Sequence, residues 1–496
     1  MTVLLAQMAV AMVTTAVRQT PTIDEPVYVG TAAVYLDQHS LRFNPEHPPL
    51  GKLIMAAGLA FADVRIDPAF SGDQTALGRH VLYEAGNSPG RLLFLARLPV
   101  IVLTLLFGLV VFLFAADLFG RVGGLVALAL YVFSPNVIAH GSLATLDVPV
   151  AGFLLTTVWL LWRARERHQV YLPLAGLAFG AALATKMSAL AAVPVMVFLA
   201  LLCGRKAFAR IGAAALIAIA VVWISYLVID PRLQSPAVPV VHGWRALADW
   251  LPLPAPYRDG MHVQFGFEDR VWGGYLFGTH YSGSRWYYLP AVLLVKTPLG
   301  ALVLWLAGAA VLLARHRVAA AYLLLPTVVL LAVAMTGSRD LGVRYVIFVP
   351  MFLAVAAGAV VASRRWWVTV LLVVFVAVGS WRTFPYYLPY SNEAFGGPSQ
   401  TYLRLHDSNV DWGQDLGLLG ERLRDEHVWL VYKGAGVPSY YGINASDPLS
   451  VPPDQVRGLL VVSNSAIAKA DDRLRALMAT STRIGDVGHS ITLFRR

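Results

Sequence analysis

The sequence predicts an α-helical polytopic membrane protein with about eleven transmembrane helices and a small α/β domain near its C-terminus. Three observations support this fold class. First, 57% of the 496 residues are hydrophobic, 14% are charged and the mean hydropathy is +0.62, whereas soluble domains contain about 45–50% apolar and about 25% charged residues. Second, long apolar runs recur along the chain. Third, basic residues concentrate in alternate connections between these runs.

The apolar runs are long enough to cross a hydrocarbon core, which takes about 20 helical residues. The first run lacks a basic segment before it and a small-residue cleavage site after it, which predicts a retained helix and not a signal peptide. The runs cover residues 2–18, 92–116, 122–139, 146–163, 170–185, 187–203, 211–229, 289–313, 318–335, 342–362 and 366–384.

The basic connections predict one orientation, because lysine and arginine accumulate in cytoplasmic loops. We therefore expect a multi-pass protein of a bacterial inner membrane, with its start inside and its tail outside. The outer face then receives loops 19–91 and 230–288 of a membrane domain, 1–384, and a C-terminal domain, 385–496. The basic residues are Arg121, Arg163, Arg165, Arg167, Arg205, Lys206, Arg210, Arg315, Arg317, Arg364 and Arg365.

The outer segments carry their own patterns. The prolines at 48 and 49 exclude a helix interior and predict a short helix just after them, lying in the membrane interface. The middle loop is dense in aromatic residues (WGGYLFGTHYSGSRWYY), which suits the headgroup region or a surface for stacking sugars. The tail alternates short strands with helices (VWLVYKG, GLLVVSN, AKADDRLRALMA, SITLFRR), which predicts the small α/β domain.

Composition excludes several classes of protein. The single cysteine, Cys203, excludes a disulfide framework and a cysteine-based zinc site within one chain. The formal net charge of +10 would suggest nucleic acid in a soluble protein. Since the arginines here lie between apolar runs, membrane orientation accounts for them, and we expect no nucleic-acid partner.

Two polar groups follow the first apolar run. Asp24 and Glu25 come directly after it, where an aspartate is a good helix cap or, alternatively, a base that removes a proton from an incoming hydroxyl. Glu46 and His47 lie at the rigid bend before Pro48-Pro49. A single histidine beside prolines is often no more than a packed hydrogen-bonding residue.

Ionisable residues within apolar runs are costly and often functional. A boundary charge is the alternative for Lys186, and an ion pair with Asp340 is the alternative for Arg339. A transporter places its charges near the midplane, whereas the predicted topology brings nine of the ionisable residues to the outer side: Asp24, Glu25, Glu46, His47, Lys52, Asp147, Lys186, Arg339 and Arg344. This second set comprises Arg97, Asp147, Lys186, Arg339 and Arg344.

At these residues the sequence resembles the protein O-mannosyltransferase family and its bacterial relatives in the GT-C superfamily of polyprenyl-phosphate-sugar transferases. The likeness covers the first 200 residues in motif order, and the stretch DSNVDWGQDL is similar to the tail of uncharacterised bacterial members. The matching positions are the acidic pair Asp24-Glu25, the motif His47-Pro48-Pro49-Leu50-Gly51-Lys52, Arg97, the pair Leu146-Asp147, and Lys186.

The resemblance implies an inverting transfer of a hexose or pentose from a polyprenyl-monophosphate donor to a hydroxyl at the outer membrane face. It assigns catalysis to Asp24, Glu25 and Asp147, with Asp24 as the base, and substrate or loop contacts to Glu46 and His47. It assigns binding of the donor phosphate to Lys52, Arg97, Lys186, Arg339 and Arg344. No cofactor is required, although a second relative, the lipid A aminoarabinose transferase, implies a divalent metal near Glu46 and His262.

Some properties stay open. The middle loop is too short for the β-trefoil domain of eukaryotic members, so the acceptor can be a protein, a lipid or a glycan. A lipid flippase or secondary transporter remains an alternative, but it requires a passage open to both faces. A receptor-like scaffold is a further alternative, but it leaves the charges at the interface without a purpose.

Overall fold

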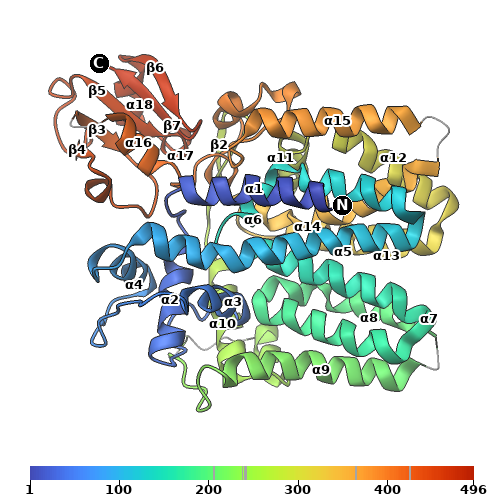
Figure 1. Cartoon of the computed structure of the whole chain (residues 1–496). Helices are drawn as coiled ribbons and strands as arrows, with labels where there is room; N and C mark the ends of the chain where they lie inside the picture. Colours follow the sequence, from blue (N-terminus) through green and yellow to red (C-terminus); the bar gives the residue numbers. More distant parts are fainter. Residues whose placement is uncertain (205–206, 237, 239–242, 363–365, 424–425) are drawn as a thin grey trace.

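The computed structural model describes the whole chain except residues 205–206, 237, 239–242, 363–365 and 424–425. Figure 1 shows a bundle of roughly aligned helices with a small sheet domain at one end, on the left of the view. Helices α2 and α4 of the first outer loop lie at this same end. Four of the basic residues used to predict the orientation lie outside the described residues: Arg205, Lys206, Arg364 and Arg365.

The bundle is built from apolar sequence, as the composition predicts. Its first half contains α1 (Thr2–Arg18), α5 (Pro89–Val132), α6 (Pro135–Gly141), α7 (Asp147–Thr185), α8 (Val193–Leu201) and α9 (Phe208–Leu227). Its second half contains α11 (Tyr288–Lys296), α12 (Leu299–Arg315), α13 (Arg317–Ala334), α14 (Phe348–Ala357) and α15 (Trp366–Thr383).

Within the described residues, four helices are long and apolar enough to cross a membrane, namely α5, α9, α13 and α15. A fifth arises if α11 and α12, which meet at 117°, form one broken span. The two longest helices, α5 and α7, contain non-helical residues at Gly120 and Arg167. These breaks fall between runs that the sequence separates, and the count of about eleven spans stays a prediction.

The loops that the sequence predicts to lie outside fold into short elements. The first loop forms α2 (Glu25–Asp37), α3 (Leu50–Leu59) and α4 (Gln74–Arg79), and α3 begins directly after Pro49, where the prolines predict a start. The middle loop forms α10 (Ala255–Glu268) and an antiparallel hairpin of β1 (Gly273–Leu276) and β2 (Thr279–Ser282). Its two turn residues, Phe277 and Gly278, both have positive φ, as a tight hairpin turn requires.

The C-terminal domain is the small α/β unit that the tail pattern predicts. Its five-stranded sheet has the order β4-β3-β5-β7-β6, in which β3 runs parallel to β4 and β5, and β7 runs antiparallel to its neighbours. The strands are β3 (His427–Val431), β4 (Asn444–Ser446), β5 (Leu459–Ser463), β6 (Thr482–Val487) and β7 (Ile491–Arg495). The helices are α16 (Leu416–Leu423), α17 (Asn464–Ala468) and α18 (Asp472–Ala479).

Both faces of the sheet are covered, because alternate residues of a strand point to opposite faces. Along β5, Val461 joins an apolar cluster that includes Leu419 of α16. Its neighbour Val462 joins a second cluster, which includes Leu474 and Leu477 of α18. The domain therefore has a core of its own.

Candidate active site

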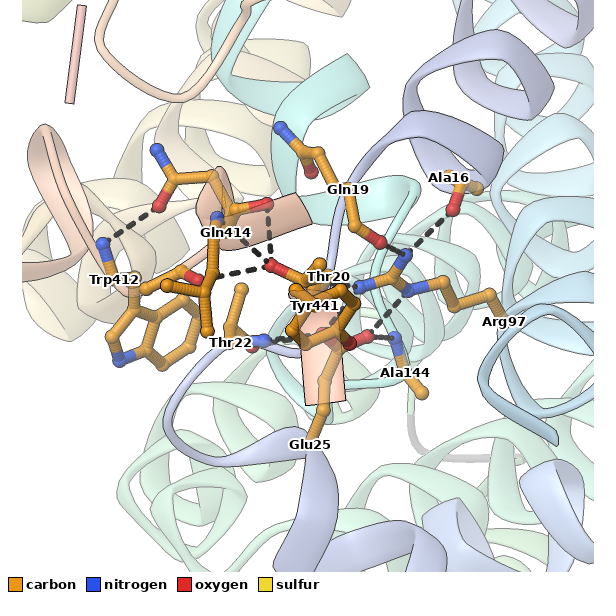
Figure 2. Close-up of polar contacts among 12 residues, drawn as sticks. Ala16, Gln19, Thr20, Thr22, Glu25, Arg97, Ala144, Trp412, Gln414 and Tyr441 are labelled. Carbon is orange, nitrogen blue, oxygen red and sulfur yellow. Dashed lines mark hydrogen bonds and ion pairs between the residues drawn. The ribbon is translucent and has the colours of Figure 1, made fainter. Parts of the chain in front are cut away.

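The acidic pair separates into two side chains with different surroundings. Glu25 is completely buried and receives hydrogen bonds from Arg97 Nε at 2.7 Å and Nη2 at 2.6 Å. It also accepts from the backbone N of Ala144 at 2.8 Å and from the N and Oγ1 of Thr22 at 2.9 and 3.0 Å. Figure 2 shows these contacts converging from α2, α5 and the loop before α7.

Arg97 uses all five of its N–H donors in this network. Beyond Glu25, its Nη1 donates to the carbonyls of Ala16 and Gln19 at 2.6 and 2.8 Å, and its Nη2 donates to the carbonyl of Thr20 at 3.1 Å. A guanidinium has five N–H groups, so none is left for a phosphate. Arg97 therefore does not fit the phosphate contact that the sequence suggests, and it instead ties the end of α1 to α2 and α5.

The chain between α1 and α2 is held from its other side by the C-terminal domain. Thr20 donates from its N and Oγ1 to the carbonyl of Gln414, at 2.9 Å each, and Ile23 N donates to the carbonyl of Trp412 at 3.0 Å. Figure 2 shows Trp412 and Gln414 beside Thr20 and Thr22. We call residues 20–23 with residues 412–414 the strap, and it ends one residue before Asp24.

Asp24 occupies the cap position of α2, but its side chain makes no capping hydrogen bond. Instead Oδ2 lies 2.5 Å from Nη1 of Arg344, and 26% of the Asp24 side chain is exposed. Arg344 lies over the rings of Trp412 and Tyr345, at 4.4 and 5.2 Å from their centroids. Its buried Nε has no hydrogen-bond partner in the described part of the chain, so Arg344 retains a free donor.

A second ion pair joins the two ends of α7. Asp147 is the first residue of this helix and Lys186 follows its last residue, and the break at Arg167 brings the ends together. Their side chains meet at 2.5 Å between Asp147 Oδ1 and Lys186 Nζ. The ammonium of Lys186 lies 5.5 Å from the ring centroid of Tyr345. Tyr345 thus contacts both cations, and we call Asp24, Arg344, Asp147, Lys186 and Tyr345 the outer ion-pair cluster.

The proline motif holds the bend at residues 44–47 in place. Lys52 is fully buried and its ammonium donates to the carbonyl and side-chain oxygens of Asn44, at 2.9 and 3.0 Å, and to the carbonyl of His47 at 2.7 Å. All three of its donors hold the bend, so Lys52 does not fit a phosphate contact either. Gly51 lets α3 approach the start of α7, since a Cβ there would lie 2.3 Å from Leu146 Cδ2.

His47 lies inside this bend and faces the ring of Tyr28 at 6.0 Å. Burial, and then four nearby cations, hold the pKa of His47 well below its ordinary value, so its imidazole is neutral at pH 7. The four cations come from separate parts of the chain, and their common effect shows that these segments converge: Lys186, Lys52, Arg339 and Arg344.

The middle loop covers the bend. Gln264 of α10 donates to the carbonyl of Glu46 at 3.0 Å, and Glu46 Oε1 accepts from Gln74 at 2.8 Å. Arg339 pairs with Glu268 of α10 at 3.0 Å and not with Asp340. Asp340 accepts instead from the middle loop, from Tyr281 and Arg285.

The implied metal ligands do not form a site. His262 Nε2 lies 3.1 Å from Asp249 Oδ1, while Glu46 contacts Gln74. Across the described residues, His, Cys, Asp and Glu form no group of three or more that could hold a metal ion. Glu46 and His262 thus do not fit the divalent metal that the resemblance implies.

The sequence analysis did not single out several residues that lie at the site. Asn409 accepts from the backbone N of Val343 at 2.9 Å, and Lys296 is buried and donates to the carbonyls of Leu388 and Asn409 at 2.6 Å each. Buried His140 faces Trp412 at 6.2 Å between ring centroids. The available signals were a lysine ending an apolar run and the dense polar stretch DSNVDWGQDL.

That polar stretch is buried between the two domains, and its acids have divergent pKa values. Burial raises the pKa of Asp411 to about 6, although Ser463 and Ser465 donate to it. Burial, reinforced by the charge of Asp411, raises the pKa of Asp415 to about 7. For Asp407, burial opposes ionisation, but the ion pair with Lys433 prevails and holds the pKa well below its ordinary value.

The chain resembles known proteins in part of its sequence and in its fold. The sequence profile of the dolichyl-phosphate-mannose-protein mannosyltransferase family matches residues 90–229. The crystal structure of ArnT from Cupriavidus metallidurans in the apo state aligns with a TM-score of 0.53 and 13% identity, covering 99% of this chain and 97% of that one. The chain therefore has a fold similar to that of ArnT over nearly its whole length.

A second ArnT structure agrees with this assignment of fold. A structure of the same ArnT bound to undecaprenyl phosphate aligns equally, with a TM-score of 0.53, 12% identity and the same coverage. The Saccharomyces cerevisiae protein O-mannosyltransferase Pmt1-Pmt2 complex bound to the sugar donor aligns over 46% of this chain and 33% of that one, with 16% identity and a TM-score of 0.30. No curated protein matches the sequence significantly. The likeness to the mannosyltransferase family thus lies in residues 90–229, which include the long apolar helix α5.

Proposed function

We propose that this protein transfers a sugar from a polyprenyl-monophosphate donor to a hydroxyl acceptor, with inversion at the anomeric carbon. The observation that carries the proposal is the outer ion-pair cluster. It holds two carboxylates and two cations side by side, and one of these carboxylates is partly open to solvent. Such a cluster offers both a base for the acceptor and positive charge for a departing phosphate.

Asp24 is the proposed base. Its carboxylate takes the proton of the acceptor hydroxyl, whose oxygen forms a bond to the anomeric carbon on the face opposite the phosphate. The bond from that carbon to the phosphate oxygen breaks, and its electron pair leaves with the polyprenyl phosphate. The acceptor gains the sugar and Asp24 gains the proton, so one product is a glycoside and the other is the lipid monophosphate.

Arg344 and Lys186 are the proposed phosphate ligands. Both are cations of the cluster, and the free Nε of Arg344 leaves it a donor beyond its pairing with Asp24. A phosphate bound there would compete with Asp24 for the guanidinium and so release the carboxylate to act as a base. Arginine and lysine stabilise negative charge that grows on a leaving group.

The remaining predicted residues receive supporting roles. Glu25 and Arg97 position the strap and thereby Asp24, while Lys52 holds the bend that carries Glu46 and His47. Asp147 orients Lys186 through their ion pair. Arg339 holds α10 over the bend. We place the site at the outer face of a bacterial inner membrane, as the basic connections indicate.

The test is a panel of radiolabelled polyprenyl-phosphate sugars, offered to the purified full-length protein in bilayer discs. We expect at least one hexose or pentose donor to lose its sugar in a single turnover, with release of free polyprenyl monophosphate. The ArnT structure bound to undecaprenyl phosphate favours an undecaprenyl chain as the first choice. Movement of labelled lipid between the leaflets of vesicles without cleavage of any donor would contradict the proposal and favour a flippase.

A further inference from the structure

A surface hollow of about 540 Å³ lies at the end of the bundle remote from the C-terminal domain. It is formed where α5, α7 and the turn between α12 and α13 meet, and none of the site residues described above lines it. Its polar lining includes three arginines, Arg165, Arg315 and Arg317, together with His316 and Asp117. Its apolar walls include Trp162 and Phe119.

Among the residues that the structure describes, the three arginines have no carboxylate partner. Asp117, the only acid among the described residues of the lining, is engaged by Arg163 at 2.6 Å and by the indole of Trp159 at 2.8 Å. Within the described part of the chain, Arg165, Arg315 and Arg317 form no ion pair, and Arg165 lies over the ring of Trp162 at 4.6 Å. The hollow therefore carries an excess of positive charge beside one neutralised acid.

The start of α13 also reaches the hollow, beside the end of α12, whose last carbonyls carry the opposite partial charge. Arg317 is the first residue of the helix, and the preceding His316 supplies no side-chain cap. The first N–H groups of a helix lack partners within it and carry a partial positive charge. Residues Arg317, Val318 and Ala319 all line the hollow, so these N–H groups lie where the unpaired guanidinium groups gather.

The hollow also adjoins surface that suits lipid. Leu313 on α12 is 61% exposed, Val318 on α13 is 46% exposed and Val122 on α5 is 63% exposed. In a membrane protein such exposed apolar residues face acyl chains. An anion bound in the hollow would thus have its hydrocarbon directly beside it, which favours a lipid headgroup over a free phosphate ion.

We propose that this hollow binds the phosphate headgroup of an anionic phospholipid from the leaflet at this end of the bundle. Guanidinium groups recognise phosphate through paired donors, and basic pockets between membrane helices are suited to such headgroups. The proposal does not depend on sugar transfer, because none of these residues belongs to the outer ion-pair cluster.

The experiment is native mass spectrometry of the full-length protein, titrated with phosphatidylglycerol or with phosphatidylcholine. We expect the wild type to retain phosphatidylglycerol preferentially. The double variant Arg315→Gln/Arg317→Gln should weaken that binding by about tenfold or more, since each basic group near anionic lipid contributes about 1 kcal/mol. The single variant Arg165→Gln provides a milder test if the double variant misfolds.

One control tests the location of the site, and a second tests whether the bound phosphate belongs to a lipid. Arg91→Gln removes an exposed arginine from the other end of α5 and should leave phosphatidylglycerol binding unchanged. Millimolar inorganic phosphate should not displace the lipid. Equal retention of phosphatidylglycerol by the wild type and the double variant would overturn the site, and full displacement by inorganic phosphate would overturn its assignment to lipid.

Discussion

Asp24 and Glu25 are neighbours in sequence, yet their surroundings assign them opposite tasks. Glu25 is sealed from solvent and accepts five hydrogen bonds, whereas Asp24 has one cationic partner and partial exposure. A group that exchanges protons with a substrate needs access to it, and only Asp24 has that access. Asp24 therefore lies at the cap position of α2 without using its side chain as a cap.

We predict that Asp24→Asn lowers single-turnover sugar transfer by about 10²-fold or more, because the amide cannot accept the hydroxyl proton. Donor binding should persist, since Arg344 and Lys186 remain. The measurement is transfer from the donor identified in the panel, with melting temperature as a check on folding. Asp37→Asn, at the exposed end of the same helix, is the matched control and should transfer normally. Near-normal transfer by a folded Asp24→Asn protein would remove Asp24 from the reaction.

The sequence could predict residue types at the site better than their partners. An acid such as Asp147 that opens an apolar run is costly unless paired, and this reasoning alone pointed to it. For Arg97 and Lys52 the family resemblance implied a phosphate contact, but their donors are taken by backbone carbonyls of residues 16, 19, 20, 44 and 47. Carbonyl acceptors leave no mark in the sequence, because every residue has one.

At the scale of elements, the Glu25–Arg97 pair joins three segments that are far apart in the sequence. It connects the end of α1, the start of α2 and the first turns of α5, and through Ala144 it reaches the loop before α7. An ion pair excluded from water contributes little net stability when intact, but it is strongly destabilising when one partner is removed. Its role here is to fix the positions of Asp24 and Asp147 relative to each other.

We predict that Arg97→Leu destabilises the protein by about 3–5 kcal/mol, because Glu25 becomes an unpaired buried charge. The measurement is reversible unfolding in detergent, followed by helical circular dichroism. The double variant Arg97→Leu/Glu25→Leu should recover part of that loss, since it removes both charges. Direct phosphate binding by Arg97 predicts the contrary pattern, in which Arg97→Leu melts like the wild type and loses donor affinity.

The elements themselves were predictable in proportion to their length and periodicity. The strands β3, β5 and β7 and the helix α18 come from strong local patterns and agree with expectation. Strand β4 has three residues and the exposed strand β6 has little apolar alternation, so neither stands out from a loop. The hairpin β1–β2 lay in an aromatic segment whose pattern favoured the membrane interface.

At the scale of the whole molecule, the C-terminal domain docks through a layer of buried acids. The pKa of Asp415 is raised to about 7, well above its ordinary value, so the folded state favours the protonated carboxyl. Folding then takes up a proton between about pH 4 and pH 7. The stability that this group contributes is present below its ordinary pKa and is lost as the pH rises through 7.

We predict that Asp415→Asn, which mimics the protonated carboxyl, becomes stabilising relative to the wild type as the pH rises from 5 to 8. The difference should grow by up to about 2–4 kcal/mol across this range, given about 1.4 kcal/mol for each unit of pKa shift. Thermal unfolding of both proteins at several pH values measures it. Asp472→Asn, on the fully exposed surface of α18, should show no such trend. A constant difference between Asp415→Asn and wild type would refute the shifted pKa.

The strap has a consequence for the synthesis of the protein. Residues 20–23 leave the ribosome early, but their partners, residues 412–414, are made nearly 400 residues later. Until then the segment leading to Asp24 is anchored on one side only, through Arg97. A nascent chain with every apolar run already inserted would therefore still lack half the support of its proposed base. On the proposed topology, delivery of the tail across the bilayer would supply the missing half of that support.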